Sequence, residues 1–206
     1  MTQAVNRTTG GQWTPEIRIA NPPPALLAKY TVREKKFFYD YASFVVKTLG
    51  NDQVQGGLAR IFAIENLRFE KLLDIRVMVF PARQLRGRSD RVLHGSYSHS
   101  SSQISLYPLK FPRDWVKREG FDLFTKSYDD ISSREKRLLY EMSKTAIATL
   151  LHEILHVKFE GRGMASYAEE GLVRKLEGQY MQDWEPTISL ATKIVFADSS
   201  LRLPSL

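Results

Sequence analysis

The feature of this sequence that most constrains its fold is an apolar stretch that carries two histidines at a helical spacing. Residues 150–157 read LLHEILHV and belong to a longer run, 132–157, that contains no glycine or proline. Apolar residues recur along this run at helical intervals, which predicts one long helix. Charged and imidazole groups in so apolar a setting are costly unless they are paired. We therefore expect His152, Glu153 and His156 to have partners.

The two histidines are spaced to bind one metal ion. Four residues advance an α-helix by a little over one turn, so His152 and His156 point the same way and can offer two imidazole nitrogens to one ion. Glu153 lies about 100° further round the helix and can reach a water molecule on that ion. A zinc ion that keeps one position open for water needs three protein ligands, so a third ligand is required.

Carboxylates on the following segment can supply that third ligand. The chain has no cysteine, and its other two histidines, His94 and His99, both lie upstream. Downstream, a turn with glycine precedes residues 166–182, whose pattern predicts a second helix with Glu169 and Glu170 near its start. A helical hairpin would bring one of these two carboxylates to the metal.

The sequence HEILH followed by EEGLVRKLE resembles the zincin metallopeptidases, in particular the aminopeptidase-N-like gluzincins. In those enzymes H-E-x-x-H precedes a second helix of the form E-G-x-x-x-x-x-E. The resemblance spans about residues 74–182. It implies a zinc ion held by His152, His156 and Glu170, the glutamate directly before the glycine, and it implies that Glu153 is the general base. The spacer between the two motifs is shorter than in the large aminopeptidases and closer to that of small zincins.

The resemblance also implies a function, the hydrolysis of peptide bonds in a protein or peptide substrate. Zinc lowers the pKa of its bound water from 15.7 toward roughly 7, and Glu153 would take that proton and deliver it to the leaving amine. An extended substrate is expected to lie antiparallel to an edge strand from residues 92–109. An oxyanion-stabilising residue is also expected, and the sequence leaves four candidates open. They are Tyr167, Tyr180, His94 and Tyr97.

Three polar features near the motifs have two interpretations each. Glu177, on the same face as Glu170, either orients a ligand histidine or faces the solvent. His94 either contributes to the site or is an ordinary hydrogen-bonding residue. The four arginines in residues 83–91 either contact phosphate or an acidic substrate, or form a solvated basic loop.

The fold class expected is α+β and zincin-like. It consists of a small mixed, mainly antiparallel sheet of three or four short strands, packed on the active-site helix and the glutamate helix, with N-terminal helices. Residues 1–30, which contain three consecutive prolines, are predicted to be an irregular or disordered arm. Residues 31–206 are predicted to be a single metallopeptidase domain, because the chain has room for one sizeable core.

Local patterns assign the elements of that domain. A helix is expected over residues 31–49 and a second, less regular one over 58–73. A short β-branched run at 74–80 predicts a buried strand. Two alternating runs, 92–98 and 103–109, predict a hairpin or a pair of neighbouring strands. The C-terminal tail has a mixed pattern of apolar and polar residues, and Pro186 limits the regular structure expected there.

The charge of the chain leaves a nucleic-acid partner open. It has 30 Lys and Arg against 23 Asp and Glu, which gives a formal net charge of +7, and its pI is near 9.6. Such a charge attracts polyanions. No apolar run approaches the roughly 20 residues of a membrane-spanning helix, and the N-terminus has no apolar leader. We therefore expect a cytoplasmic protein without a membrane partner.

Three alternatives to a general zinc metallopeptidase stay open. A DNA-associated protease resembling the SprT-type small zincins would suit the charge, although its third ligand is typically His and no histidine follows His156. A regulatory protease resembling the small HExxH proteins that cleave repressors is the second. In the third, a non-catalytic binding module, four protein ligands would close a metal site that only ties two helices together.

Overall fold

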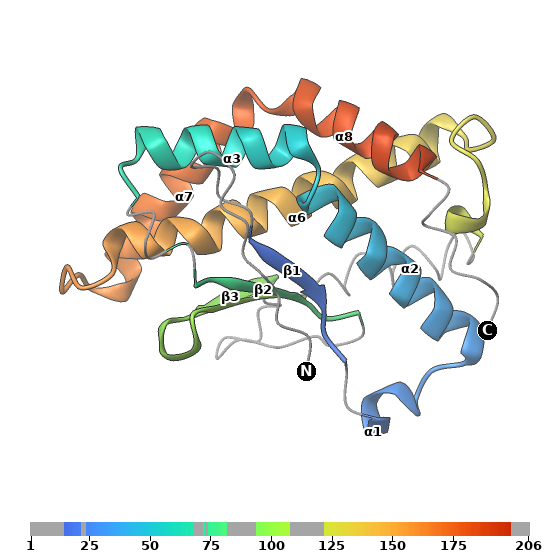
Figure 1. Cartoon of the computed structure of the whole chain (residues 1–206), viewed down its shortest axis with the longest axis horizontal. Coiled ribbons are helices and arrows are strands. Elements are labelled where there is room, and N and C mark those ends of the chain that lie inside the picture. The colour runs from blue at the N-terminus through green and yellow to red at the C-terminus, as the bar shows by residue number, and fades with distance from the viewer. Residues whose placement is uncertain are drawn as a thin grey trace.

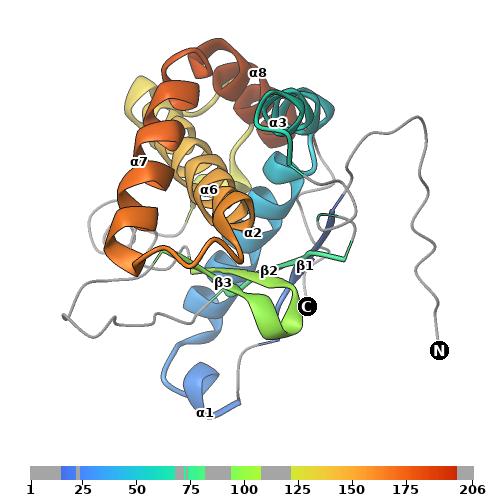
Figure 2. The ribbon, with the colours of Figure 1, turned by 90° about the vertical axis from the view of Figure 1, so that its left-hand side faces the viewer.

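The computed structural model describes residues 15–21, 24–67, 72, 74–81, 94–107 and 122–198, and it shows an α+β fold that is mostly helical. A four-stranded sheet forms the lowest layer in Figure 1. Helices α2 (Val32–Leu49) and α6 (Ser133–Phe159) pack on one face of this sheet. Helices α3 (Asp52–Ile64) and α8 (Glu185–Ala197) lie beyond them, as the view in Figure 2 shows.

The sheet is mixed, and most of its pairing is parallel. Its order is β1-β2-β4-β3, from β1 (Glu16–Ile19) through β2 (Arg76–Val79) and β4 (Gln103–Leu106) to β3 (Gly95–Ser98). The pairs β1–β2 and β2–β4 are parallel, and β3–β4 is antiparallel. The predicted hairpin is confirmed, but the prediction of a mainly antiparallel sheet is wrong. A hairpin pattern indicates only the local pairing, whereas both parallel pairs join strands that are distant in sequence.

The N-terminal segment takes part in this sheet. Strand β1 pairs in register with β2, and the N–H of Ala20 donates to the carbonyl of Val79 at 2.8 Å. The predicted irregular arm over residues 1–30 is therefore wrong at β1, where Ile17 and Ile19 pack against the core. The short helix α1 (Pro24–Leu27) follows, and it begins on a proline, which suits the first position of a helix. Residues 1–14 and 22–23 of the predicted arm lie outside the described residues.

Helix starts follow the capping signals of the sequence. Thr31 caps α2 and forms a reciprocal capping box with Glu34. Ser132 caps α6 in the same way with Glu135. The predicted helices at 31–49 and 166–182 are confirmed, the second as α7 (Ser166–Gln182).

Two helices differ from expectation. Helix α3 begins at Asp52, earlier than the sequence pattern suggested, because Asn51 caps it. Helix α8 occupies the C-terminal stretch for which no regular element was expected, and its proline lies in the first turn, where the missing N–H has no helical partner to lose. None of the helices among the described residues is long and apolar enough to span a membrane.

Helix α6 is the centre of the molecule and the platform for the candidate site. It contacts α2, α7, α8, β3 and β4, and it is the long central helix in Figure 1. Its buried side chains include Leu150, Leu151, Ile154 and Leu155, which surround the two histidines in sequence. Replacing one such leucine by alanine typically costs about 2–5 kcal/mol. The two histidines are therefore part of a helix whose neighbouring apolar side chains are packed in the core.

Candidate metal centre

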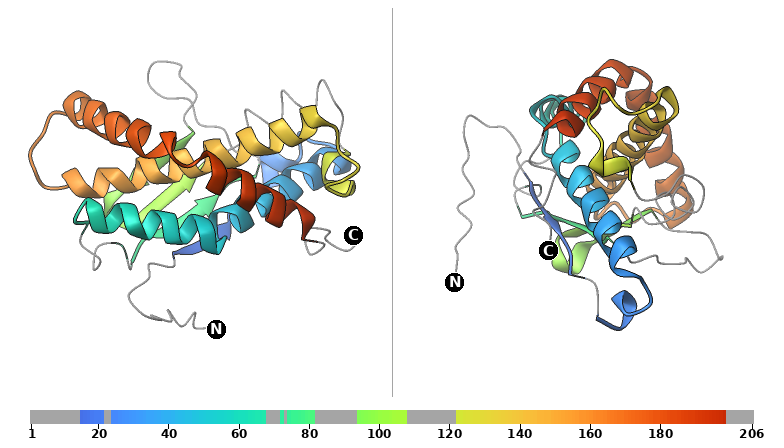
Figure 3. Two further views of the ribbon diagram at one scale, coloured as in Figure 1. Left: turned by 90° about the horizontal axis from the view of Figure 1, so that it is seen from above. Right: turned by 90° about the vertical axis from the view of Figure 1, so that its right-hand side faces the viewer.

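A tight turn folds α7 back against α6. The turn follows Phe159 and contains Gly161 and Gly163, whose φ angles of 77° and 64° lie in the left-handed region that favours glycine. Figure 3 shows α7 returning alongside α6 from this turn. The two helices form the hairpin that the sequence predicts, and it brings the glutamates of α7 to the histidines of α6.

The hairpin brings His152, His156 and Glu170 together. The Nε2 atom of His152 lies 3.5 Å from Oε1 of Glu170, and the Nε2 atom of His156 lies 3.5 Å from Oε2 of Glu170. One ligand atom from each of the three residues falls within 4.8 Å of the others. Two tetrahedral ligand atoms that each lie about 2.1 Å from a zinc ion are about 3.4 Å apart. The separations therefore fit three ligands around one ion.

Each imidazole ring also contacts a carboxylate through its Nδ1 atom. Nδ1 of His152 lies 2.9 Å from Glu177, and Nδ1 of His156 lies 2.7 Å from Glu169. A ring that donates its Nδ1 proton to a carboxylate keeps a lone pair on Nε2, which is the atom that faces Glu170. Of the two roles considered for Glu177, the structure therefore shows contact with a histidine. Glu169 contacts His156 and leaves Glu170 to face both Nε2 atoms.

Electrostatics at the cluster favour a bound cation. Burial lowers the pKa of His152, but its hydrogen bond to Glu177 and the nearby carboxylates outweigh burial and raise that pKa above the usual value. Partial burial raises the pKa of Glu170. The hydrogen bond from Arg174 and the nearby charges of Arg174 and the two imidazoles outweigh burial, so that the pKa lies below the usual value. Four carboxylates thus gather around two rings, and this excess of negative charge suits a divalent ion.

Glu153 points from α6 toward the edge strand β3. Its side chain is only 8% exposed and accepts a hydrogen bond from the backbone N–H of Tyr97. Burial raises the pKa of this carboxyl, although the two imidazoles oppose the rise. A carboxyl with a raised pKa can accept and return a proton near neutral pH.

Gly95 makes room for Glu153, a role that the sequence analysis did not predict. A Cβ atom on Gly95 would lie 2.9 Å from Oε1 of Glu153 and 2.6 Å from Cγ2 of Thr149. These separations are too short for any side chain. The only signal in the sequence was a glycine inside the predicted strand at 92–98, where glycine often marks a close approach.

The four oxyanion candidates are spread over the molecule. Tyr167 lies one turn before Glu170 on α7 and is 84% exposed. The Tyr97 ring packs against the ring of His99 with centroids 4.6 Å apart. Tyr180 donates its hydroxyl proton to Glu65, so this hydroxyl is engaged elsewhere. His94 precedes β3, and its carbonyl accepts from the N–H of Tyr107.

Neither upstream histidine joins the cluster. The Nδ1 atom of His99 lies 3.1 Å from Glu160. Among the residues that the structure describes, the metal-binding group of three side chains contains neither His94 nor His99. The predicted basic loop with its four arginines lies outside the described residues.

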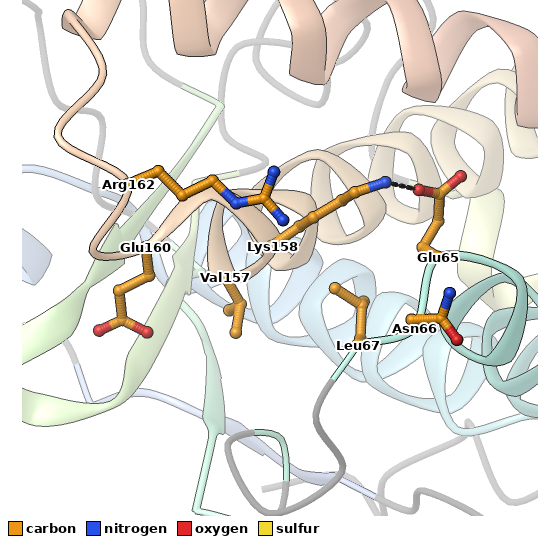
Figure 4. A pocket seen from close by; sticks show the side chains of 7 residues that line it. All are labelled: Glu65, Asn66, Leu67, Val157, Lys158, Glu160 and Arg162. Carbon is orange, nitrogen blue, oxygen red and sulfur yellow. Dashed lines mark hydrogen bonds and ion pairs between the residues drawn. The ribbon is translucent and has the colours of Figure 1, made fainter.

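A second cavity lies on another side of α6. It measures about 450 Å³ and sits at the C-terminal ends of α3 and α6. Figure 4 shows the Lys158 side chain reaching across it to Glu65, with which it forms an ion pair. Lys158 follows His156 by two residues and so points about 200° away from it. This cavity therefore does not open onto the metal ligands. Its lining consists of Glu65, Asn66, Leu67, Val157, Lys158, Glu160 and Arg162.

No protein-family model, curated protein or solved structure matches this chain.

Proposed function

We propose that this chain is a zinc-dependent metallopeptidase of the gluzincin type. One observation supports the proposal above all: two Nε2 atoms and one carboxylate converge at separations suited to a single ion, and carboxylates hold both Nδ1 atoms. A chance pair of histidines would not need a separate carboxylate behind each ring. His152, His156 and Glu170 would hold the metal.

Glu153 has the position and the environment of a general base. A bound zinc ion would supply Lewis acidity, lowering the pKa of a water molecule and polarising the scissile carbonyl. Glu153 would accept the proton of the attacking water and then return it to the leaving amine. Its burial against β3 excludes bulk water and raises the pKa of its carboxyl, so that the carboxyl can both take up and release a proton.

Strand β3 offers a place for an extended peptide. It is the last strand of the described sheet order, pairs with β4 on one side, and contacts α6 through Gly95 near Glu153. An extended peptide can add to such an edge through main-chain hydrogen bonds, which do not depend on its side chains. We therefore propose protein or peptide substrates that bind in an extended conformation along β3.

Glu153 also separates a peptidase from a metal that only ties α6 to α7. In a structural site this carboxyl has no chemical role. The test compares wild type, Glu153→Gln and the control Glu141→Gln, which changes the same group on α6 far from the cluster. Each protein is loaded with zinc and incubated with a peptide mixture from a digested proteome, and mass spectrometry identifies the new termini.

Wild type and the control are expected to cleave peptides, while Glu153→Gln keeps its zinc and cleaves at least about 100-fold more slowly. Cleavage by Glu153→Gln at the wild-type rate would contradict the assignment of the base. A zinc-loaded wild type that cleaves no peptide would favour the structural role.

A further inference from the structure

Arg174 lies one turn after Glu170 on α7 and touches its carboxylate. The Nε atom of Arg174 donates a hydrogen bond to Oε1 of Glu170 at 2.8 Å. The arginine side chain is 63% exposed, and the Glu170 side chain is 35% exposed. An exposed ion pair at this spacing contributes little to stability. The contact is therefore of interest for what it does to the carboxylate.

The contact makes the two oxygens of Glu170 unequal. Oε1 accepts from Arg174 and lies 3.5 Å from Nε2 of His152, whereas Oε2 lies 3.5 Å from Nε2 of His156. A charge-assisted hydrogen bond occupies a lone pair and offsets part of the charge on its acceptor. Oε2 is consequently the better donor to a metal ion.

We propose that Arg174 is a positioning residue that restricts Glu170 to one oxygen on the metal. The inference rests on the proposed metal centre. A zinc ion with two imidazoles and one carboxylate oxygen keeps a fourth position free, as a hydrolytic site requires. A carboxylate that binds through both oxygens would take up part of this space. Arg174 thereby protects the open position without binding the ion.

The experiment uses the full chain with cobalt(II) in place of zinc, because the visible absorption of cobalt reports its coordination number. Four-coordinate cobalt absorbs more strongly per ion than five-coordinate cobalt. Wild type is compared with Arg174→Met, which removes every donor, and with Arg174→Lys, which keeps a cation at the same spacing. Lys175→Met is the matched control, because it is an exposed cation on the same helix. Circular dichroism first establishes that each variant is folded.

We expect wild type, Arg174→Lys and Lys175→Met to share one strong cobalt spectrum at one ion per chain. Arg174→Met should bind one ion with a clearly weaker band, as Glu170 turns both oxygens to the metal. If Arg174→Met is unfolded, Arg174→Leu, which also has no donor, takes its place.

Two results would overturn the inference. The first is a wild-type spectrum in the variant that lacks the arginine. The second is complete loss of cobalt from that folded variant, because the proposed role restricts Glu170 and does not supply affinity. A wild-type chain that binds no metal would instead refute the metal centre itself, so the two failures can be told apart.

Discussion

At the scale of single residues, each of the two histidine rings has a carboxylate beside both of its nitrogens. The H-E-x-x-H spacing places both rings on one side of α6, but it does not determine how each ring is rotated. Glu177 and Glu169 determine that rotation through the Nδ1 atoms, which leaves both Nε2 atoms directed at Glu170. Carboxylates in this position commonly affect metal affinity nearly as much as the ligands do.

Replacing Glu177 by glutamine should weaken zinc binding by about 10- to 100-fold, because His152 loses a charged partner for its Nδ1 proton. The measurement is a competition titration with a chelator. Asp183→Asn serves as the control, since it neutralises an exposed carboxylate at the end of the same helix. Equal zinc affinity in wild type and Glu177→Gln would show that the contact does not support the site.

Gly95→Ala should slow peptide hydrolysis at least tenfold while zinc binding persists. The new Cβ atom would displace Glu153, which is the proposed base and not one of the proposed metal ligands. Initial rates and metal content are measured on the same samples. The control is Gly178→Ala on α7, where an added Cβ atom meets nothing within 4 Å. Unchanged hydrolysis by Gly95→Ala would contradict the proposed position of the base.

Sequence reasoning selected three candidate ligands that the structure brings together, because helical geometry is local. The positions of His152 and His156 follow from their spacing alone, and Glu170 followed from its place before a glycine in a resembling motif. The roles of Gly95 and Arg174 could not be predicted. The first depends on where β3 lies against α6, and the second depends on a side-chain rotamer, and neither is encoded in a short sequence pattern.

At the scale of elements, helix ends were more predictable than strand pairing. Capping residues act within one turn, and Thr31 and Ser132 stand directly before α2 and α6, where the predicted helical ranges also begin. The proline of α8 was interpreted as a limit to regular structure, although it stands in the first turn, where it is compatible with a helix. Strand β1 was missed because its partner β2 is distant in sequence.

Asp40 on α2 should make the protein less stable as the pH rises. It is buried, and burial raises its pKa above the usual 3.8 although Lys36 opposes the rise from 2.8 Å. The folded state then holds this proton more tightly than the unfolded state, so stability falls as pH rises from about 3.8 through the folded-state pKa.

Urea unfolding of wild type and Asp40→Asn between pH 3.5 and pH 7 tests this expectation on metal-free protein. The asparagine side chain cannot ionise. The unfolding free energy of Asp40→Asn should therefore increase relative to that of wild type as the pH rises through that range. A difference that stays constant with pH, or changes in the opposite direction, would contradict the raised pKa.

Glu65 joins three helices through one carboxylate. It follows α3, pairs with Lys158 of α6, and accepts from the hydroxyl of Tyr180 of α7. Its side chain is 8% exposed. Glu65→Ala should lower the free energy of unfolding by about 1–3 kcal/mol, because two donors lose their acceptor.

A double-mutant cycle with Tyr180→Phe isolates the hydroxyl contact of Glu65. The combined variant should lose less stability than the sum of the single changes, since both remove the same hydrogen bond. Chemical denaturation of the four proteins supplies the numbers. Strict additivity would show that the hydroxyl does not contribute to the junction.

At the scale of the whole molecule, the α+β class and the helical hairpin could be predicted, and the arrangement of the sheet could not. The strong periodicity of α6 and the glycines after it indicate a helix that reverses into α7. The parallel placement of β1 beside β2 depends on how α2, which follows β1 and contacts both strands, packs on the sheet in three dimensions. Local sequence patterns carry no information on how distant strands pair in the sheet.

The whole arrangement places the candidate centre where α6, α7 and β3 meet. Helix α6 carries the two imidazoles and the proposed base, α7 carries the proposed third ligand and the two carboxylates that contact the imidazoles, and β3 lies beside the proposed base. An ion bound there would link α6 to α7 and stabilise the folded state over the unfolded one.

Metal content measured by mass spectrometry tests the central claim most directly. Wild type, Glu153→Gln and Glu170→Ala are each equilibrated with zinc and freed of unbound metal. We expect one zinc ion per chain in wild type and in Glu153→Gln, and far less than one in Glu170→Ala. One full equivalent in folded Glu170→Ala, or none in wild type, would contradict the account.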